Sequence, residues 1–175
     1  MFIDLSDVLS EHHKPVDRIV PVEMTVFESA LGSMPVIEKE DAHIEVTHVK
    51  DRELYIQVQG KVSVNIPCDR CLEDVRCDID LDFEKRVDLA RTDAELIEGL
   101  DESNFIDGYH LDADQLIFNG IVSEWPMKIL CSDDCKGICS VCGCNRNEGS
   151  CDCEDPGLDP RMSVIREVFM NFKEV

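Results

Sequence analysis

The chain has 175 residues, of which 43% are hydrophobic, 38 are acidic and 17 are basic. This length fits one domain with a modest core, or one domain and a small module held together by metal. The composition excludes a wholly disordered chain. No apolar run approaches the roughly 20 residues that a membrane span requires. The first residues carry early acids without the basic start of a signal peptide. We therefore expect a cytoplasmic protein that has no contact with a membrane.

The net charge of −21 is spread unevenly along the chain. Residues 88–127 carry ten acids against the single base Arg91, whereas residues 128–175 carry nine acids and six bases. A surface this acidic repels phosphate groups, which disfavours broad binding to nucleic acid and favours a basic protein partner. A charge that only keeps a small protein soluble explains the composition equally well.

The predicted elements begin with a short helix over 4–11, capped by Asp4 or Ser6. Four segments then alternate apolar and polar residues with the period of a half-buried strand: 19–27, 42–49, 53–67 and 77–89. Gly60 interrupts the apolar row of the longest one and predicts a bulge or a bend. Such segments predict an α+β fold built on an antiparallel sheet that curls towards a barrel. The residues expected to face the core are Val20, Val22, Met24, Val26, Ile44, Val46, Leu54, Ile56, Val58, Val62, Val64, Ile66, Ile79, Leu81 and Phe83.

The second half of the chain shows helical signals. Residues 88–109 lose periodicity and are very acidic, which predicts a mobile connecting loop. A helix over 112–125 follows, with Asp112 as its cap and Pro126 as its stop. A last helix begins at Asp159 and Pro160, with an amphipathic stripe typical of core packing: Met162, Ile165, Val168, Phe169 and Phe172. We therefore predict a mainly β domain over 1–126 and a cysteine-rich module with a C-terminal helix over 127–175.

Cysteine spacing is the clearest chemical signal. Seven of the ten cysteines lie between Cys131 and Cys153. In a reducing compartment such clustering indicates metal or redox chemistry rather than disulfides. The string Cys139-Ser-Val-Cys142-Gly143 has the form of a zinc knuckle, because two thiolates at this spacing can bind one ion from a single turn. Gly143 would supply the positive φ needed after the second ligand.

Two four-cysteine zinc sites follow from these pairs. The first combines the knuckle with the nearby C-x-C pair: Cys139, Cys142, Cys151 and Cys153. A C-x-C pair has a tighter bite, so Cys144 or Cys135 could replace one of its two members. The second site uses the remaining pairs and would join the strand domain to the module: Cys68, Cys71, Cys131 and Cys135. We interpret Cys77 and Cys144 as small buried hydrophobic residues that do not bind metal. We expect the chain to bind one or two structural Zn²⁺ ions.

Catalytic motifs are missing from the sequence. The five histidines lack metal spacing, and there is no G-x-S-x-G and no glycine-rich phosphate loop. A catalytic zinc keeps an open position beside three protein ligands, whereas an all-cysteine set is typical of closed structural sites. We therefore expect no enzymatic activity. The alternative is a thiol–disulfide or redox-sensing protein in which Arg70 lowers a thiolate pKa within Cys68-Asp-Arg-Cys71, but no thioredoxin-like context surrounds this pair.

Two strings resemble the signatures of the bacterial YceD family, in the zinc-binding variant of Gram-positive type. One is Cys68-Asp-Arg-Cys71-Leu-Glu73, and the other runs from Trp125 to Gly143 and continues through Cys151-Asp-Cys153 to Asp159-Pro-Arg161. The resemblance spans essentially the whole chain. It implies a non-enzymatic factor for large-subunit ribosomal RNA accumulation and large ribosomal subunit biogenesis, with the eight cysteines of the two predicted sites as the family's cysteines. Cys77 and Cys144 are additions to that pattern.

The implied partner is a basic ribosomal protein or another ribosome-assembly component, and no small-molecule substrate is expected. The residues predicted to contact it lie beside the first C-x-x-C and around the knuckle: Arg70, Leu72, Glu73, Lys136 and Arg146. A local contact with ribosomal RNA could use a basic face formed by Lys128, Lys136, Arg146, Arg161 and Arg166. Exposed charged residues are equally typical of a solvated loop.

Overall fold

The computed structural model describes residues 1–30, 32–50, 52–90 and 104–153. Its backbone contacts divide the chain into two compact units. The first unit comprises Met1–Ile66 and Asp74–Ile129, and the second combines Pro67–Glu73 with the chain from Leu130 onwards. The predicted C-terminal helix and most of the predicted acidic loop lie outside the described residues.

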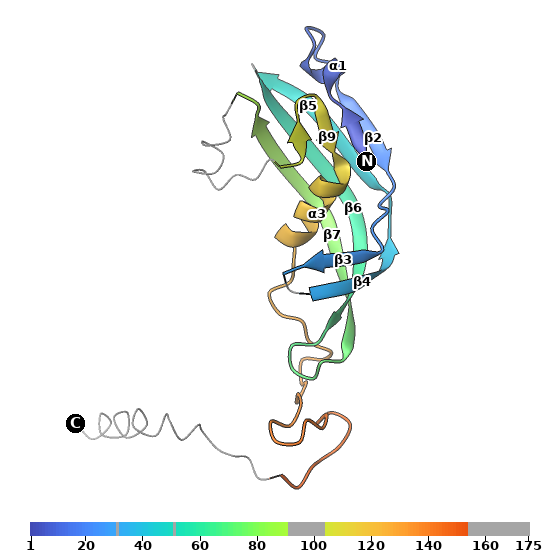
Figure 1. Cartoon of the computed structure of the whole chain (residues 1–175), viewed down its shortest axis with the longest axis vertical. Helices are drawn as coiled ribbons and strands as arrows, with labels where there is room; N and C mark the ends of the chain where they lie inside the picture. Colours follow the sequence, from blue (N-terminus) through green and yellow to red (C-terminus); the bar gives the residue numbers. More distant parts are fainter. Residues whose placement is uncertain (31, 51, 91–103, 154–175) are drawn as a thin grey trace, which may run out of the picture. The chain divides into compact units, whose positions relative to one another are not determined.

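The first unit is built on a six-stranded antiparallel sheet (Figure 1). Its strands pair in the order β2-β5-β6-β4-β3, and β7 pairs with β6. The bounds are β2 Val16–Val20, β3 Val26–Ser29, β4 Gly32–Lys39, β5 Ala42–Lys50, β6 Glu53–Pro67 and β7 Asp74–Asp88. Among the described strands none pairs β2 or β3 with β7, so the predicted curl into a barrel is wrong. A barrel requires its first and last strands to pair, whereas here other elements cover one face of an open sheet.

A small sheet and one helix supply this cover. The small sheet has the order β1-β9-β8, with β1 Phe2–Asp4, β8 Ile106–Asp107 and β9 His110–Asp112. The helix α3, Ala113–Ser123, has Asp112 as its N-cap, and the Asp112 carboxylate accepts hydrogen bonds from the backbone N–H groups of Asp114 and Gln115. The predicted helix and its cap are confirmed, although α3 already ends at Ser123, before Pro126.

The apolar row of β6 faces the core, as predicted. All six apolar residues of its inward row are at most 3% exposed. They contribute to two buried clusters, one packed against the small sheet and the other beneath α3. Gly60 lies where β6 changes partner, since β5 pairs with it as far as Gln59 and β4 pairs from Val62. A Cβ at Gly60 would lie 3.3 Å from the Cα of Ala42, so a side chain here would require the backbone of Ala42 to shift slightly.

The prediction of one strand over 19–27 is wrong. The structure has β2 and β3 separated by 21–25, because Pro21 lacks the N–H that a ladder requires. The alternation also reverses after the break: Val26 is 42% exposed and Phe27 is buried. Strand β4, paired with both β3 and β6, was not predicted. Its Pro35 is atypical of a strand interior.

The short helix near the N-terminus is confirmed only in part. The structure has α1 over Ser6–Leu9, with Leu5 at the cap position and no side-chain cap. The Asp4 carboxylate still accepts a hydrogen bond from the backbone N–H of Ser6 at 2.8 Å. The remaining predicted strands, 42–49 and 77–89, correspond to β5 and β7.

Gly120 is required by the packing of α3 on β7. A Cβ at this position would lie 2.3 Å from Cε1 of Phe83. We expect Gly120→Val to lower the free energy of unfolding by about 1–3 kcal/mol, the usual cost of an overpacked core. Denaturant unfolding measures this change. In a Phe83→Leu background the same substitution should cost clearly less; an equal cost in both backgrounds would contradict steric crowding as its cause.

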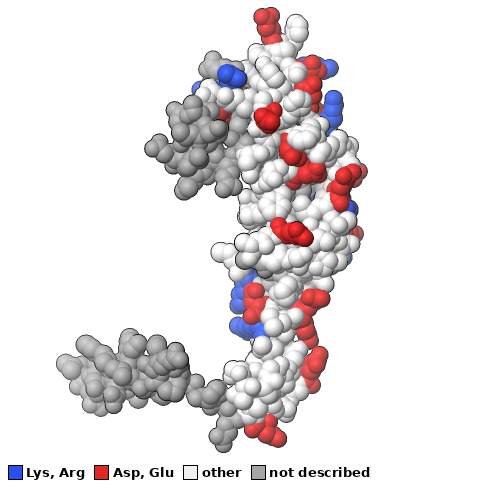
Figure 2. Space-filling view, viewed as in Figure 1, with Lys and Arg blue, Asp and Glu red and all other residues white. Residues whose placement is uncertain are grey.

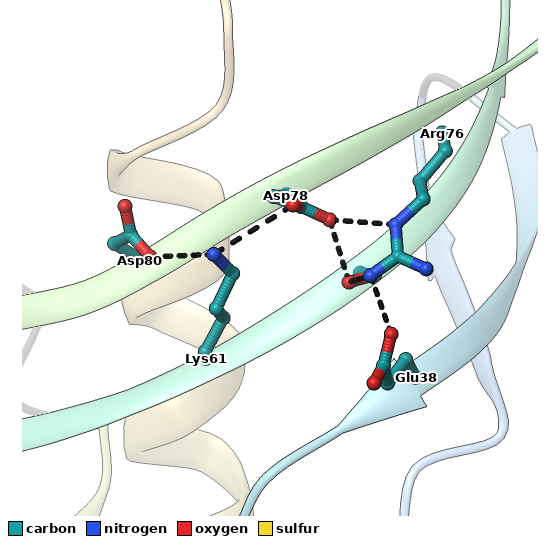
Figure 3. Close-up of polar contacts among 6 residues, drawn as sticks. Glu38, Lys61, Arg76, Asp78 and Asp80 are labelled. Carbon is teal, nitrogen blue, oxygen red and sulfur yellow. Dashed lines mark hydrogen bonds and ion pairs between the residues drawn. The ribbon is translucent and has the colours of Figure 1, made fainter.

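A polar network crosses β4, β6 and β7 on the open face of the sheet (Figure 3). The Ser63 hydroxyl donates to Asp78 at 2.7 Å, and the Arg76 guanidinium donates to Asp78 at 2.9 Å and also contacts Glu38. Lys61 lies 3.6 Å from Asp78 on the other side. Ser63 is the one buried polar side chain among the described residues. The network therefore satisfies this hydroxyl and links the three strands.

The same network predicts a dependence of stability on pH. The hydrogen bond from Ser63, and then that from Arg76, lower the pKa of Asp78. A lowered carboxyl pKa contributes stability above the ordinary pKa, and this contribution is lost as the pH falls through the folded-state value. We expect Asp78→Asn to lower the melting temperature at pH 7, and the difference from the wild type to narrow as the pH falls below the ordinary carboxyl pKa of 3.8. A constant difference across that range would show that Asp78 acts by packing alone.

Candidate metal centres

The loop between β6 and β7 is a tight turn that brings two thiols together. The backbone N–H of Cys68 donates to the Glu73 carbonyl at 2.7 Å, and that of Leu72 donates to the Cys68 carbonyl at 3.0 Å. Leu72 adopts a φ of 63°, a left-handed conformation that closes the turn. Cys68 and Cys71 are both buried. The loop belongs to the second unit, as do all the other cysteines of the predicted sites.

The first candidate centre combines this loop with residues that follow α3. The sulfur atoms of its four cysteines all lie within 4.8 Å of one another: Cys68, Cys71, Cys131 and Cys135. The sulfur–sulfur distance is 3.8 Å between Cys68 and Cys135 and 3.4 Å between Cys71 and Cys131. Four thiolates at about 2.3 Å from a tetrahedral Zn²⁺ lie roughly 3.8 Å apart. The spacing therefore fits a metal ion, and all ten cysteines are outside disulfides.

The second candidate centre is formed by the knuckle. Its four sulfurs also lie within 4.8 Å of one another: Cys139, Cys142, Cys151 and Cys153. The backbone N–H of Gly143 donates to the Cys139 carbonyl at 2.9 Å, and the φ of Gly143 is 74°. The positive φ predicted for Gly143 is thus confirmed. The backbone N–H of Val141 points at the Cys139 sulfur, 3.5 Å away, as a knuckle requires.

The thiol pKa values show why each cluster suits a cation. The backbone N–H groups of Cys142 and Val141 lower the pKa of Cys139 to about 5. Burial opposes the ionisation of Cys68, but surrounding backbone N–H groups outweigh it and lower the pKa to about 6. The thiol of Cys142 raises the pKa of Cys153 to about 12. Each cluster thus contains thiols whose pKa is lowered and thiols whose pKa is raised, so ionisation of all four requires a compensating positive charge.

The two additional cysteines are not members of these quartets. Cys77 packs against the core cluster beneath α3. The neighbouring Cys142 thiol raises the pKa of Cys144 to about 12. Cys144 is therefore close to the second cluster, but the four sulfurs that converge are those of the predicted first choice.

The residues predicted to contact a partner are largely engaged inside the second unit. The Arg70 guanidinium donates to the Cys135 carbonyl at 2.8 Å, and Glu73 accepts from the Asn145 side chain at 2.7 Å. Arg146 donates to the Cys139 sulfur at 3.8 Å. Leu72 is 64% exposed. Lys136 and Arg146 line an open hollow of about 420 Å³ together with Asn147 and Ser150. Of the predicted basic face, Arg161 and Arg166 lie outside the described residues.

One residue at the centres was missed by the sequence reasoning. The Asn147 side chain donates to the sulfur of Cys135 at 3.3 Å and to that of Cys131 at 3.9 Å. In the sequence, an asparagine that donates a hydrogen bond to a cysteine sulfur cannot be distinguished from an asparagine that only forms a turn. Only the fold of 135–147 shows the difference.

An antiparallel β unit and a second unit with two four-cysteine clusters define a protein that can hold two metal ions. A family model described as Large ribosomal RNA subunit accumulation protein YceD matches residues 54–169, about two thirds of the chain and both clusters. The chain therefore belongs to the YceD family, as the sequence motifs indicated. No curated protein and no solved structure matches it. Within the described part of the chain, no helix is long and apolar enough to cross a membrane.

Proposed function

We propose that this protein is a non-enzymatic, cytoplasmic factor for large-subunit ribosomal RNA accumulation and large ribosomal subunit biogenesis. The observation that carries the proposal is the family match over residues 54–169, whose description names this process. The all-thiolate donor sets support the absence of catalysis, because four protein ligands leave a zinc ion no open position for a substrate.

The proposed cofactor is Zn²⁺, one ion in each cluster, as in the zinc-binding variant that the sequence resembles. Thiolate sulfur is a preferred zinc ligand, and the sulfur spacing of the first cluster agrees with tetrahedral coordination. When bound, each ion would neutralise thiolate charge and cross-link two separate segments of the chain. Cys68 and Cys71 would be joined to Cys131 and Cys135, while the knuckle would be joined to Cys151 and Cys153.

The proposed partner is a basic ribosomal protein or assembly component. The exposed row of β7 contains six acids and two arginines, and Figure 2 shows acidic side chains spread over the first unit. The acids are Asp74, Asp78, Asp80, Asp82, Glu84 and Asp88. Such a surface attracts lysine- and arginine-rich segments and speeds their association. A narrower contact with ribosomal RNA would use the hollow beside Lys136 and Arg146.

A gradient experiment tests the role. The tagged protein should co-sediment with precursors of the large subunit, and its depletion should lower large-subunit ribosomal RNA without lowering small-subunit RNA. Equal loss of both RNAs, or sedimentation of the protein only with free proteins, would contradict the proposal. Crosslinking then identifies the partner class. If RNA is crosslinked and Lys136→Ala with Arg146→Ala abolishes this while Lys50→Ala does not, the preference for a protein partner is wrong.

A thiol–disulfide or redox-sensing protein is the second candidate, because the Cys68 pKa of about 6 resembles that of a reactive thiol. Its cause differs from the predicted one: the backbone N–H of Arg70 contributes to it, whereas the guanidinium donates to a carbonyl. Alkylation of the native protein separates the two functions. Zinc-bound thiols should react slowly until a chelator is added, whereas a redox pair should react at once.

A further inference from the structure

Asn147 and Arg146 connect the two cysteine clusters from adjacent positions. The Asn147 amide nitrogen donates to the Cys135 sulfur at 3.3 Å, and the Arg146 guanidinium donates to the Cys139 sulfur in the other cluster. The Asn147 amide oxygen accepts the backbone N–H of Lys136 at 2.8 Å. Because this oxygen faces a donor, the amide N–H₂ group must face the sulfurs.

A short antiparallel pair of segments, 135–139 and 144–147, carries these contacts. Ile138 and Asn145 form a bridge, the Arg146 N–H donates to the Gly137 carbonyl at 2.9 Å, and the Cys139 N–H donates to the Cys144 carbonyl at 2.8 Å. The first segment begins and ends with a cluster cysteine. Both clusters are therefore attached to one hydrogen-bonded pair of segments.

The loop between β6 and β7 fixes this pair in place. The Arg70 carbonyl accepts the Ile138 N–H at 3.0 Å, and the Arg70 guanidinium donates to the Cys135 carbonyl at 2.8 Å. Gly137 has a φ of 74°, and a Cβ there would lie 3.0 Å from the Arg70 carbonyl oxygen. Only glycine allows this close approach. The loop that supplies two thiols to the first cluster thus also orders the segment that leads to the second.

We propose that the two clusters bind metal cooperatively, with Asn147 and Arg146 as the positioning residues of the coupling. Binding at the first cluster fixes Cys135 and Asn147, and this orders the turn that holds Arg146 against Cys139. Binding at the second cluster orders the same turn from the other end, so the coupling is reciprocal. The inference rests on the proposed two-zinc function. Couplings of this kind change affinity by roughly 5–150-fold.

The test is a zinc titration of the reduced, metal-free full chain, followed by native mass spectrometry. Two independent, equal sites give about half of the chains with one ion at half-saturation, and unequal sites give more. We expect the one-ion species to stay well below half in the wild type. In Asn147→Ala it should rise to half or above, while saturation still gives two ions. Glu148→Ala, a neighbouring exposed residue, should behave like the wild type.

A second variant measures the coupling without relying on the proportions of chains with zero, one and two ions in the mass spectrum. Cys131→Ser disables the first site and should weaken zinc binding at the second at least about 5-fold in competition with a chromophoric chelator. In an Asn147→Ala background, the same substitution should leave the second site unchanged. If the second site of Cys131→Ser binds its ion with the affinity of the wild type, the coupling is overturned and the zinc proposal stays intact. A chain that binds no zinc would overturn the zinc proposal itself.

Discussion

Removal of metal with a strong chelator under reducing conditions is expected to unfold the second unit and leave the first unit folded. Among the described residues, the buried side chains of the second unit are four cysteines, and the larger apolar residues Leu72, Ile138 and Val141 are 40–64% exposed. The described part of this unit, 67–73 and 130–153, therefore contains no apolar core that could hold it without metal. Structural zinc contributes about 10–16 kcal/mol of apparent binding energy to such modules.

Amide hydrogen exchange measured by mass spectrometry distinguishes the two units. After chelation, protection should be lost over 67–73 and 130–153 and should persist in β5 and β6, whose inward residues are fully buried. The chelator preloaded with zinc is the control and should change nothing. Persistent protection of 130–153 in a chain shown to carry no metal would mean that its hydrogen bonds alone hold the unit together.

The success of the sequence reasoning follows the strength of the local pattern. Strand β6 has fifteen residues that alternate between apolar and polar except at Gly60, so its buried face was predicted. The helix α3 has an aspartate at its N-cap, so its start was predicted. Strands β3 and β4 have four and eight residues, and Pro35 lies within β4, so their pairing depends on tertiary contacts that no local period reveals. The open edge of the sheet is likewise a property of how the whole chain packs.

The cysteine clusters could be predicted because zinc sites impose spacing on the sequence. A pair spaced like Cys139 and Cys142 indicates a turn that binds a metal ion. The predicted quartets are those whose sulfur atoms lie close together. The surrounding hydrogen bonds impose no such spacing. Arg70 was interpreted as an activator of thiols or a partner contact, yet its guanidinium binds a backbone carbonyl. Charged side chains near a metal site have several possible partners, and only the fold selects among them.

Single cysteine substitutions should show that the eight cysteines of the two clusters bind metal and that Cys77 and Cys144 do not. We expect Cys139→Ser and Cys71→Ser each to reduce the metal content from two ions per chain to one, because three thiolates and a hydroxyl bind zinc far more weakly than four thiolates. The matched controls, Cys144→Ser and Cys77→Ser, should retain two ions. Native mass spectrometry of the purified chains counts the ions directly.

The Cys144 variant is the most informative of the four, because its thiol lies beside Cys142 and the tighter C-x-C pair could leave one ligand position to it. If Cys144→Ser loses an ion and Cys153→Ser retains it, the ligand set of the knuckle includes Cys144. If both variants retain two ions, the cluster contains a spare thiol, and its coordination is exchangeable rather than closed. Such an exchangeable site would weaken the argument against catalysis, since that argument depends on four fixed ligands. Retention in Cys144→Ser together with loss in Cys153→Ser is the result that the sulfur positions predict.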